Sequence, residues 1–148
     1  MKIGELAKRA NCPVETLRYW EREGLLPAPA RTEGNYRMYS QAHLEQVLFI
    51  RNCRVLDMSL DEIRQLLALW HAPQENCEGV NALVDEHIGH VVEKIRTLKL
   101  LEKQLRELRK RCTEGRDVAA CGIIEGLTQK ALPVEAPFAA HVHSGSSH

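Results

Sequence analysis

Residues 1–27, MKIGELAKRANCPVETLRYWEREGLLP, decide the fold of this chain. Apolar side chains recur here at spacings of three and four, the period of helices with one buried face; they are Ile3, Leu6, Ala7, Ala10, Val14, Leu17 and Trp20. Asn11-Cys12-Pro13 interrupts the pattern once, because asparagine tolerates left-handed backbone and proline suits a first helical turn. With Gly24 as a C-terminal cap, the stretch predicts two short helices joined by a tight turn, a helix-turn-helix.

A hairpin and two further helices are expected to complete this N-terminal domain, residues 1–70. Gly34-Asn35 suits a sharp reversal between two short extended arms, which predicts a small wing. Ser40 is placed to cap a helix with a wide apolar face, formed by Leu44, Val47, Leu48, Phe49, Ile50, Cys53 and Leu56. Ser59 and Glu62 fit a capping box for the next helix, whose inward stripe is Leu60, Ile63, Leu67 and Trp70.

The stretch from 78 to 112 carries the longest apolar pattern. Its members follow one another at steps of three and four, close to a heptad seam: Val80, Val84, Ile88, Val91, Ile95, Leu98, Leu101, Leu105, Leu108 and Cys112. A long helix with one apolar stripe needs a partner helix to cover that stripe. The simplest partner is the same helix of a second copy of the chain. Residues 71–112 are therefore expected to hold a linker and the dimerisation helix of a homodimer. A loop with a short helix at 113–130 and a flexible, histidine-containing tail at 131–148 should follow.

Composition limits the functions open to the chain. Its 148 residues carry 20 basic and 20 acidic side chains, so any DNA contact depends on local placement of charge. No apolar run is long enough for a membrane helix and no apolar block near Met1 resembles a secretion signal, which indicates a cytoplasmic protein without a membrane partner. An enzyme is not expected, because no nucleophile paired with a base and no phosphate loop is recognisable.

The five cysteines are expected to be free thiols or metal ligands, since an odd number cannot pair fully within one chain. Cys77 and Cys112 stand at opposite ends of the long helix, about 52 Å apart at the usual helical rise. If two copies pair antiparallel, Cys77 of one chain lies beside Cys112 of the other, and Cys121 can fold back to join them. Three thiolates suit a thiophilic divalent ion such as cadmium, mercury or lead, with zinc acceptable if a fourth ligand completes a tetrahedron.

Other interpretations apply to the remaining candidate ligands. Cys12 in the tight turn and Cys53 on an apolar helical face are interpreted as small core residues, as free cysteines often are. His87 and His90 project from one side of the long helix. With Glu62 and a tail histidine such as His141 they form a hypothetical second, nitrogen-rich metal site. The alternative is that these histidines are merely solvated.

Four motifs stand in register over residues 1–70: IGELAK at 3–8, VETLRYWEREGLL at 14–26, NYRMY at 35–39 and LDEI at 60–63. Together they resemble the MerR family of transcription activators. The later segment NCEGVNALVDEHI at 76–88, with Cys112, Cys121 and Gly122-Ile123, is similar to the cadmium- and lead-responsive branch of that family. The resemblance implies a mainly α-helical protein with a winged helix-turn-helix DNA-binding domain, a long antiparallel coiled-coil dimerisation helix and a metal site shared between two chains.

The resemblance also implies a set of DNA contacts. It places Thr16, Arg18 and Tyr19 in the major groove. It assigns the phosphates of double-stranded promoter DNA to a second set of side chains: Arg31, Asn35, Tyr36, Arg37 and Arg54. The alternative is that Tyr36 and Tyr39 only pack the wing and that Arg54 is a solvated helix charge.

The mechanism that the resemblance implies is an operator switch. The homodimer occupies a palindromic operator in a promoter whose overlong spacer misaligns the two elements that RNA polymerase recognises. Metal binding orders the loop between Cys112 and Cys121 and stabilises a bent, untwisted operator that polymerase can engage. Cadmium is favoured as the inducer because of the tail histidines, and lead, mercury and zinc are alternatives. A different class of function, a thiolate metal buffer that does not bind DNA, would leave the wing and the helix pairs without a purpose.

Overall fold

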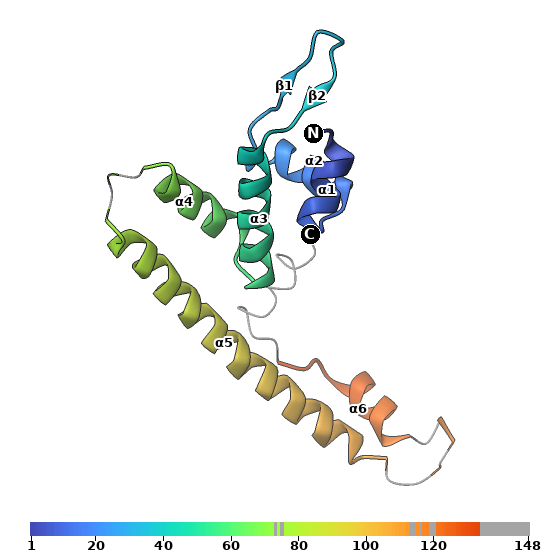
Figure 1. Ribbon diagram of the computed structural model, residues 1–148. Helices are drawn as coiled ribbons and strands as arrows, with labels where there is room; N and C mark the ends of the chain where they lie inside the picture. The colour runs from blue at the N-terminus through green and yellow to red at the C-terminus, as the bar shows by residue number, and fades with distance from the viewer. Residues whose placement is uncertain (73, 75, 113–114, 116, 119–120, 134–148) are drawn as a thin grey trace. The chain divides into compact units, whose positions relative to one another are not determined.

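The computed structural model describes residues 1–72, 74, 76–112, 115, 117, 118 and 121–133. Figure 1 shows that they form helices and one hairpin: α1 (Ile3–Ala10), α2 (Val14–Arg22), β1 (Ala30–Arg31), β2 (Arg37–Met38), α3 (Gln41–Val55), α4 (Leu60–Trp70), α5 (Glu78–Arg109) and α6 (Gly122–Gln129). The chain divides into two compact units, Met1–Leu83 and Val84–His148, so α5 begins in the first and continues in the second. Within the part of the chain described, none of the helices combines the length and apolarity needed to cross a membrane.

The predicted helix-turn-helix is formed by α1 and α2. Asn11 ends α1 in the left-handed conformation, with φ 51° and ψ 53°. The turn is closed by the Cys12 amide, which donates to the Ala7 carbonyl at 2.9 Å, and Pro13 then caps α2. Gly24 follows α2 at φ +74°, a backbone conformation that favours glycine. The interruption is therefore where the sequence predicts it, and α2 ends one residue earlier than predicted, with Glu23 as its cap and Gly24 directly after it.

The predicted wing is the antiparallel pair β1 and β2, in which Arg31 lies opposite Arg37. Asn35 makes the reversal at φ 65°, and the amide of Thr32 donates to the Tyr36 carbonyl at 2.8 Å. The base of the wing is tied to the start of the chain, because the Tyr39 amide donates to the Met1 carbonyl at 2.7 Å. The hairpin is thereby held next to the helix-turn-helix.

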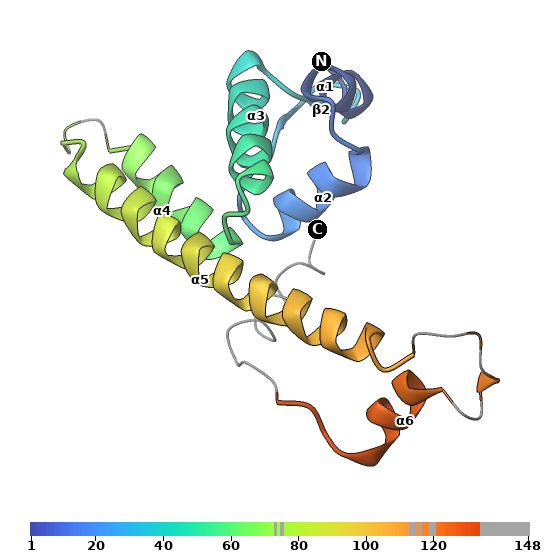
Figure 2. The ribbon, with the colours of Figure 1, turned by 90° about the horizontal axis from the view of Figure 1, so that it is seen from below.

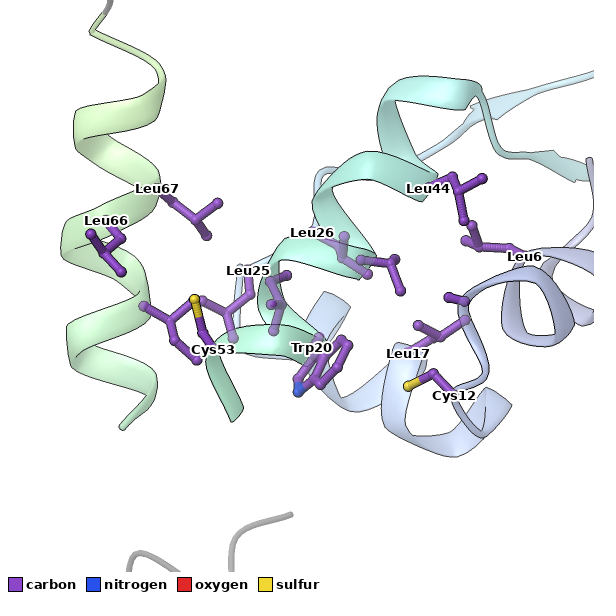
Figure 3. Packing of buried hydrophobic residues seen from close by; sticks show 14 of the residues in the cluster. Leu6, Cys12, Leu17, Trp20, Leu25, Leu26, Leu44, Cys53, Leu66 and Leu67 are labelled. Carbon is purple, nitrogen blue, oxygen red and sulfur yellow. The ribbon is translucent and has the colours of Figure 1, made fainter. Parts of the chain in front are cut away.

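The core of the first unit is built by α1 to α4 and the segment after α2. Its fully buried side chains include Leu6, Leu17, Leu25, Val47, Ile50 and Ile63. Figure 3 shows Cys12 beside Leu17 at the turn, while Cys53 points towards Leu66 of α4. Burial raises the pKa of both thiols, with a smaller opposing effect of Arg51 on Cys12. The interpretation of Cys12 and Cys53 as core residues is confirmed.

Two predicted apolar faces are wider in the sequence than in the structure. On α3, Leu48 is 36% exposed, and Leu56, its C-terminal cap, is 62% exposed. On α4, Trp70 is 42% exposed and stacks on Phe49 with ring centroids 4.8 Å apart. The prediction that Trp70 belongs to the inward stripe of α4 is therefore wrong, and the apolar face predicted for α3 is not buried over its whole width.

The predicted seam of α5 lies largely open in the single chain. Its exposed members are Val80, Val84, Ile88, Ile95, Leu98 and Leu105. In the second unit, Figures 1 and 2 show α6 beside the C-terminal end of α5. The short helix that the sequence predicts within 113–130 is therefore present as α6.

Candidate DNA-binding surface and metal centre

A groove between α2 and the wing gathers four cationic side chains. Its volume is about 560 Å³, and its lining residues are Lys2, Ile3, Arg18, Glu21, Arg22, Tyr36, Arg37 and Tyr39. The Nζ of Lys2 lies 5.2 Å from the centroid of the Tyr36 ring, which places a cation over an aromatic side chain of the wing. A concave surface with four cations and one carboxylate attracts phosphate, although the whole chain carries no net charge.

Glu21 joins the wing to α2 and is the functional residue that the sequence reasoning missed. Its Oε2 lies 3.0 Å from Nη1 of Arg37, and its Oε1 accepts a hydrogen bond from the hydroxyl of Tyr39. Burial of Tyr39 and, after it, the contact with Glu21 raise the pKa of this phenol, so it remains a donor. Glu21 stands three residues after Arg18, on the same side of α2. That spacing is the signal that could have found it.

The structure brings part of the predicted DNA-contact set together. Arg18, Tyr36 and Arg37 line the same groove. Arg31 and Arg37 line an adjoining hollow of about 290 Å³, where Nη1 of Arg31 donates to Oδ1 of Asn35 at 3.3 Å. These residues present their polar groups on one continuous face of α2 and the wing.

The other predicted contacts have different surroundings. Thr16 and Tyr19 are half-buried on α2, and Tyr19 packs against the core. Nη1 of Arg54 donates to the Met58 carbonyl at 2.8 Å, which holds the turn between α3 and α4. Arg54 lines neither of the two hollows. Its role as a phosphate contact stays a prediction, as do the major-groove contacts of Thr16 and Tyr19.

Cys112 and Cys121 form the candidate metal centre of the second unit. Cys112 lies three residues beyond the end of α5, and Cys121 caps the start of α6. Their thiols are hydrogen-bonded to each other. Nη1 of Arg109 donates to the Cys112 carbonyl at 2.6 Å. Two of the three predicted cysteine ligands are thus held side by side within one chain.

The surroundings of Cys121 favour its thiolate. The backbone amides of Ile124 and Ile123, at the start of α6, lower the pKa of this thiol. Desolvation opposes them, and Cys112 and the positive charge of Arg109 add smaller lowering effects. Because the thiolate and not the thiol binds metal, α6 supplies a ligand that is ready at lower pH than an ordinary cysteine.

Gly122 allows α6 to approach the end of α5 closely. A Cβ at this position would lie 2.5 Å from the carbonyl oxygen of Arg111 and 3.0 Å from its Cβ, which are too close for any side chain. At Gly126, one turn later, a Cβ would meet Nη1 of Arg111 at 2.5 Å. That atom is the end of a flexible side chain and can move away. Backbone contact at Gly122 therefore sets the position of Cys121, the residue before it.

Cys77 occupies the opposite end of α5. It is exposed, and its carbonyl accepts the amide of Asn81 at 2.9 Å, which starts the helix. The 32 residues of α5 separate it from Cys112, and at about 1.5 Å per residue a straight helix keeps the two far apart. One chain cannot place Cys77 and Cys112 on the same ion.

Of the residues of the hypothetical second site, His87 and His90 belong to α5 in the second unit, and Glu62 belongs to α4 in the first. On α5 the rings of His87 and His90 have centroids 6.2 Å apart and are nearly perpendicular, at 88°. His87 is buried, and Nε2 of His90 lies 4.0 Å from Oε1 of Glu86. In the first unit, Oε1 of Glu62 accepts the Ser59 amide at 3.0 Å in the predicted capping box. His141 lies outside the described residues.

A recognition helix, a wing and a cationic groove between them define a winged helix-turn-helix DNA-binding protein. Two family models match the chain, "MerR HTH family regulatory protein" over residues 1–69 and "MerR, DNA binding" over residues 44–108. The chain belongs to the MerR family of helix-turn-helix transcriptional regulators, within the group that senses heavy metals. It is a transcription regulator and not an enzyme.

Three relatives illustrate this membership. The chain is 49% identical over 111 residues to a ZntR homolog of Haemophilus influenzae, covering 75% of this chain and 82% of the relative. The crystal structure of PbrR691 from Ralstonia metallidurans in complex with lead(II) is 53% identical, with a TM-score of 0.76 over 86% of this chain and 99% of that one. The mercury(II) complex of MerR from Bacillus megaterium is 34% identical, with a TM-score of 0.66 over 87% of this chain and 100% of that one.

Proposed function

We propose that this chain, as a homodimer on a palindromic promoter operator, activates a metal-resistance or efflux gene when it binds a thiophilic divalent metal, cadmium foremost. The observation that carries the proposal is the hydrogen-bonded thiol pair of Cys112 and Cys121. Two soft ligands side by side, one with a lowered pKa, suit a soft metal ion and have no evident purpose in a protein that only binds DNA. The protein would act in the cytoplasm, where the promoter is.

The third ligand, Cys77, is proposed to come from the second chain. The open seam of α5 is an apolar stripe that a second copy of the same helix would cover. In an antiparallel pair, the start of one α5 lies beside the end of the other. Cys77 of one chain then joins Cys112 and Cys121 of the other, and the dimer has two identical sites.

On the operator, the recognition helix α2 would enter the major groove while the cationic groove receives the phosphates. The proposed promoter has an overlong spacer, and each extra base pair turns one polymerase element by about 34° against the other. Metal binding favours a bent, untwisted operator that realigns the two elements for RNA polymerase. Only a metal that binds the bent complex more tightly than the unbent one can shift this equilibrium.

The identity of the inducer rests on the donor set. Cadmium accepts three thiolates and also nitrogen ligands, and the sequence carries tail histidines together with the His87 and His90 pair. Glu62 and His141 remain proposed partners of that pair in a second site. Lead is the second candidate metal, because the structure that is 53% identical to this chain is a lead(II) complex.

Mixed dimers test the shared site directly. One chain carries Cys77→Ser and the other Cys112→Ser, with different affinity tags so that only the mixed dimer is purified. In the antiparallel arrangement one site of this dimer loses both cysteines while the other keeps all three. We expect thiolate-to-metal absorption in a cadmium titration to show half the wild-type stoichiometry at wild-type affinity.

The control is Cys53→Ala, which removes a core thiol and should keep full stoichiometry. A mixed dimer that binds metal no better than either mutant homodimer would contradict a site built from two chains. Metal bound without thiolate absorption would indicate the second, nitrogen-rich site. Failure of the intact wild-type dimer to bind any promoter fragment specifically would favour the metal-buffer alternative.

The cationic groove yields a second prediction. Arg37→Ala removes one phosphate-facing cation, so we expect operator affinity to fall about tenfold and the slope of log affinity against log salt to fall by about 1. Arg96→Ala is the matched control, because Arg96 is also an exposed arginine paired with a carboxylate, 3.1 Å from Glu93 on α5. Fluorescence anisotropy over a salt series measures both. An unchanged slope in Arg37→Ala would remove this residue from the phosphate contacts.

A further inference from the structure

The first turn of α5 passes against α4 at a position where the sequence has a glycine. A Cβ on Gly79 would lie 3.1 Å from Cδ2 and 3.5 Å from Cδ1 of Leu69, in the last turn of α4. Leu83, one turn further along the same face of α5, is buried in the core of the first unit at 8% exposure. The start of α5 therefore lies against Leu69 of α4 at Gly79, and Leu83 anchors the next turn in the core.

Cys77 is fixed to this same turn by backbone hydrogen bonds. Its carbonyl accepts the amide of Asn81 at 2.9 Å. The residue before it, Asn76, caps the helix by accepting the Glu78 amide on Oδ1 at 2.9 Å. A movement of Cys77 therefore moves the first turn of α5, and Gly79 moves with it.

On its other side α4 is attached to the end of the recognition helix. Nη2 of Arg64 lies 3.0 Å from Oε2 of Glu23 and donates to the Glu23 carbonyl at 3.1 Å. Glu23 is the C-terminal cap of α2. Contacts on the first unit thus run without a gap from Cys77, through Gly79 and Leu69, to Arg64 and the end of α2.

We infer that the contact between Leu69 and Gly79 is the coupling element that transmits metal capture at Cys77 to the recognition helix. The inference rests on the proposed function and adds two positioning residues, neither of which touches metal or DNA. When Cys77 is drawn to a metal ion, the first turn of α5 shifts and presses on the Leu69 side chain, because less than the room for a methyl group separates them at Gly79. Because Leu69 is part of α4, this helix moves with it, and the contact of Arg64 with Glu23 moves the end of α2. The recognition helix then takes the position that the bent operator requires.

Two glycines of α5 make a matched pair for the test. Gly79→Ala crowds Leu69, whereas Gly89→Ala adds the same methyl group at a position with no atom within 4 Å. Leu69→Ala empties the space, and the double variant Leu69→Ala/Gly79→Ala partly refills it. All four are compared with wild type as full-length reduced dimers, by cadmium titration and by energy transfer between the ends of a labelled operator with and without cadmium.

We expect Gly79→Ala to bind cadmium in the absence of DNA, and the operator in the absence of cadmium, within about threefold of wild type. The cadmium-induced change in operator shape should need at least about fivefold more metal. Gly89→Ala should match wild type, and the double variant should respond better than either single variant. Non-additivity of this kind identifies direct contact and is not expected of general destabilisation.

The inference is overturned if Gly79→Ala and Gly89→Ala respond alike, or if the losses in the double variant simply add. Should Gly79→Ala fail to bind the metal-free operator because the crowding unfolds it, the double variant, in which the crowding is relieved, carries the comparison. A wild-type protein that binds neither cadmium nor a specific operator would instead defeat the proposed function. The two failures are therefore distinguishable in one set of measurements.

Discussion

Gly122→Ala is expected to weaken cadmium binding about 10- to 100-fold, although residue 122 offers no ligand atom. The added methyl group would lie 2.5 Å from the Arg111 carbonyl oxygen, which belongs to the backbone and cannot turn aside. The start of α6 must retreat, and Cys121 moves away from Cys112 and from the amides that lower its pKa. Losses of this size are typical when a residue that supports metal ligands is changed. Competition with a chelator of known affinity measures the effect.

Gly126→Ala is the control for Gly122→Ala. The same methyl group meets only the flexible end of Arg111 and, at 3.2 Å, Cδ1 of Leu108. We expect its cadmium affinity to stay within about threefold of wild type, since alanine also raises helix propensity. Equal cadmium affinities of the two variants would show that the close approach of α6 to α5 does not determine how near the Cys112 and Cys121 thiols lie to each other.

Leu17→Ala is expected to lower the free energy of unfolding by about 2–5 kcal/mol. Leu17 lies on α2, is 0% exposed and belongs to the core cluster of the first unit. Its truncation leaves a cavity beneath the recognition helix. Urea unfolding followed by circular dichroism measures the change, at one fixed protomer concentration because the stability of a dimer depends on it.

Leu48→Ala provides the comparison for Leu17→Ala within the same unit. Leu48 is on α3 and 36% exposed, so its truncation should cost about 1 kcal/mol or less. A similar cost at both positions would contradict the core assignment of α2. Tryptophan fluorescence can follow the same transition, because Trp20 lies on α2 and is buried at 4% exposure.

The sequence predicts the fold well wherever a local rule determines the backbone. Asn11 and Gly24 end helices because few other residues tolerate left-handed backbone, and the capping box of Ser59 and Glu62 forms as predicted. Periodicity is less informative about the width of an apolar face. It marks Leu56 and Trp70 as apolar positions but does not say how far a neighbouring helix extends over them. Both are exposed for that reason.

The candidate sites depend more on how closely two elements of the fold approach each other, and the spacing of residues in the sequence does not predict that distance. The structure places Cys112 next to Cys121. Spacing in the sequence does not explain why α6 comes close enough for this; the backbone contact at Gly122 does. Glu21 was missed because an acidic residue on a DNA-facing helix looks unfavourable until its two partners in the wing are visible. The three-cysteine site across two chains stays a prediction.

The shared carboxylate of Glu21 also constrains how this domain can change over evolutionary time. The Tyr39 hydroxyl, on a side chain that is only 3% exposed, and the Arg37 guanidinium both depend on it. If residue 21 loses its carboxylate, the buried Tyr39 hydroxyl has no acceptor. Phenylalanine, which has no hydroxyl, is then more stable than tyrosine at position 39. Positions 21, 37 and 39 should therefore be replaced together in distant lineages, although the first two are 16 positions apart in the chain.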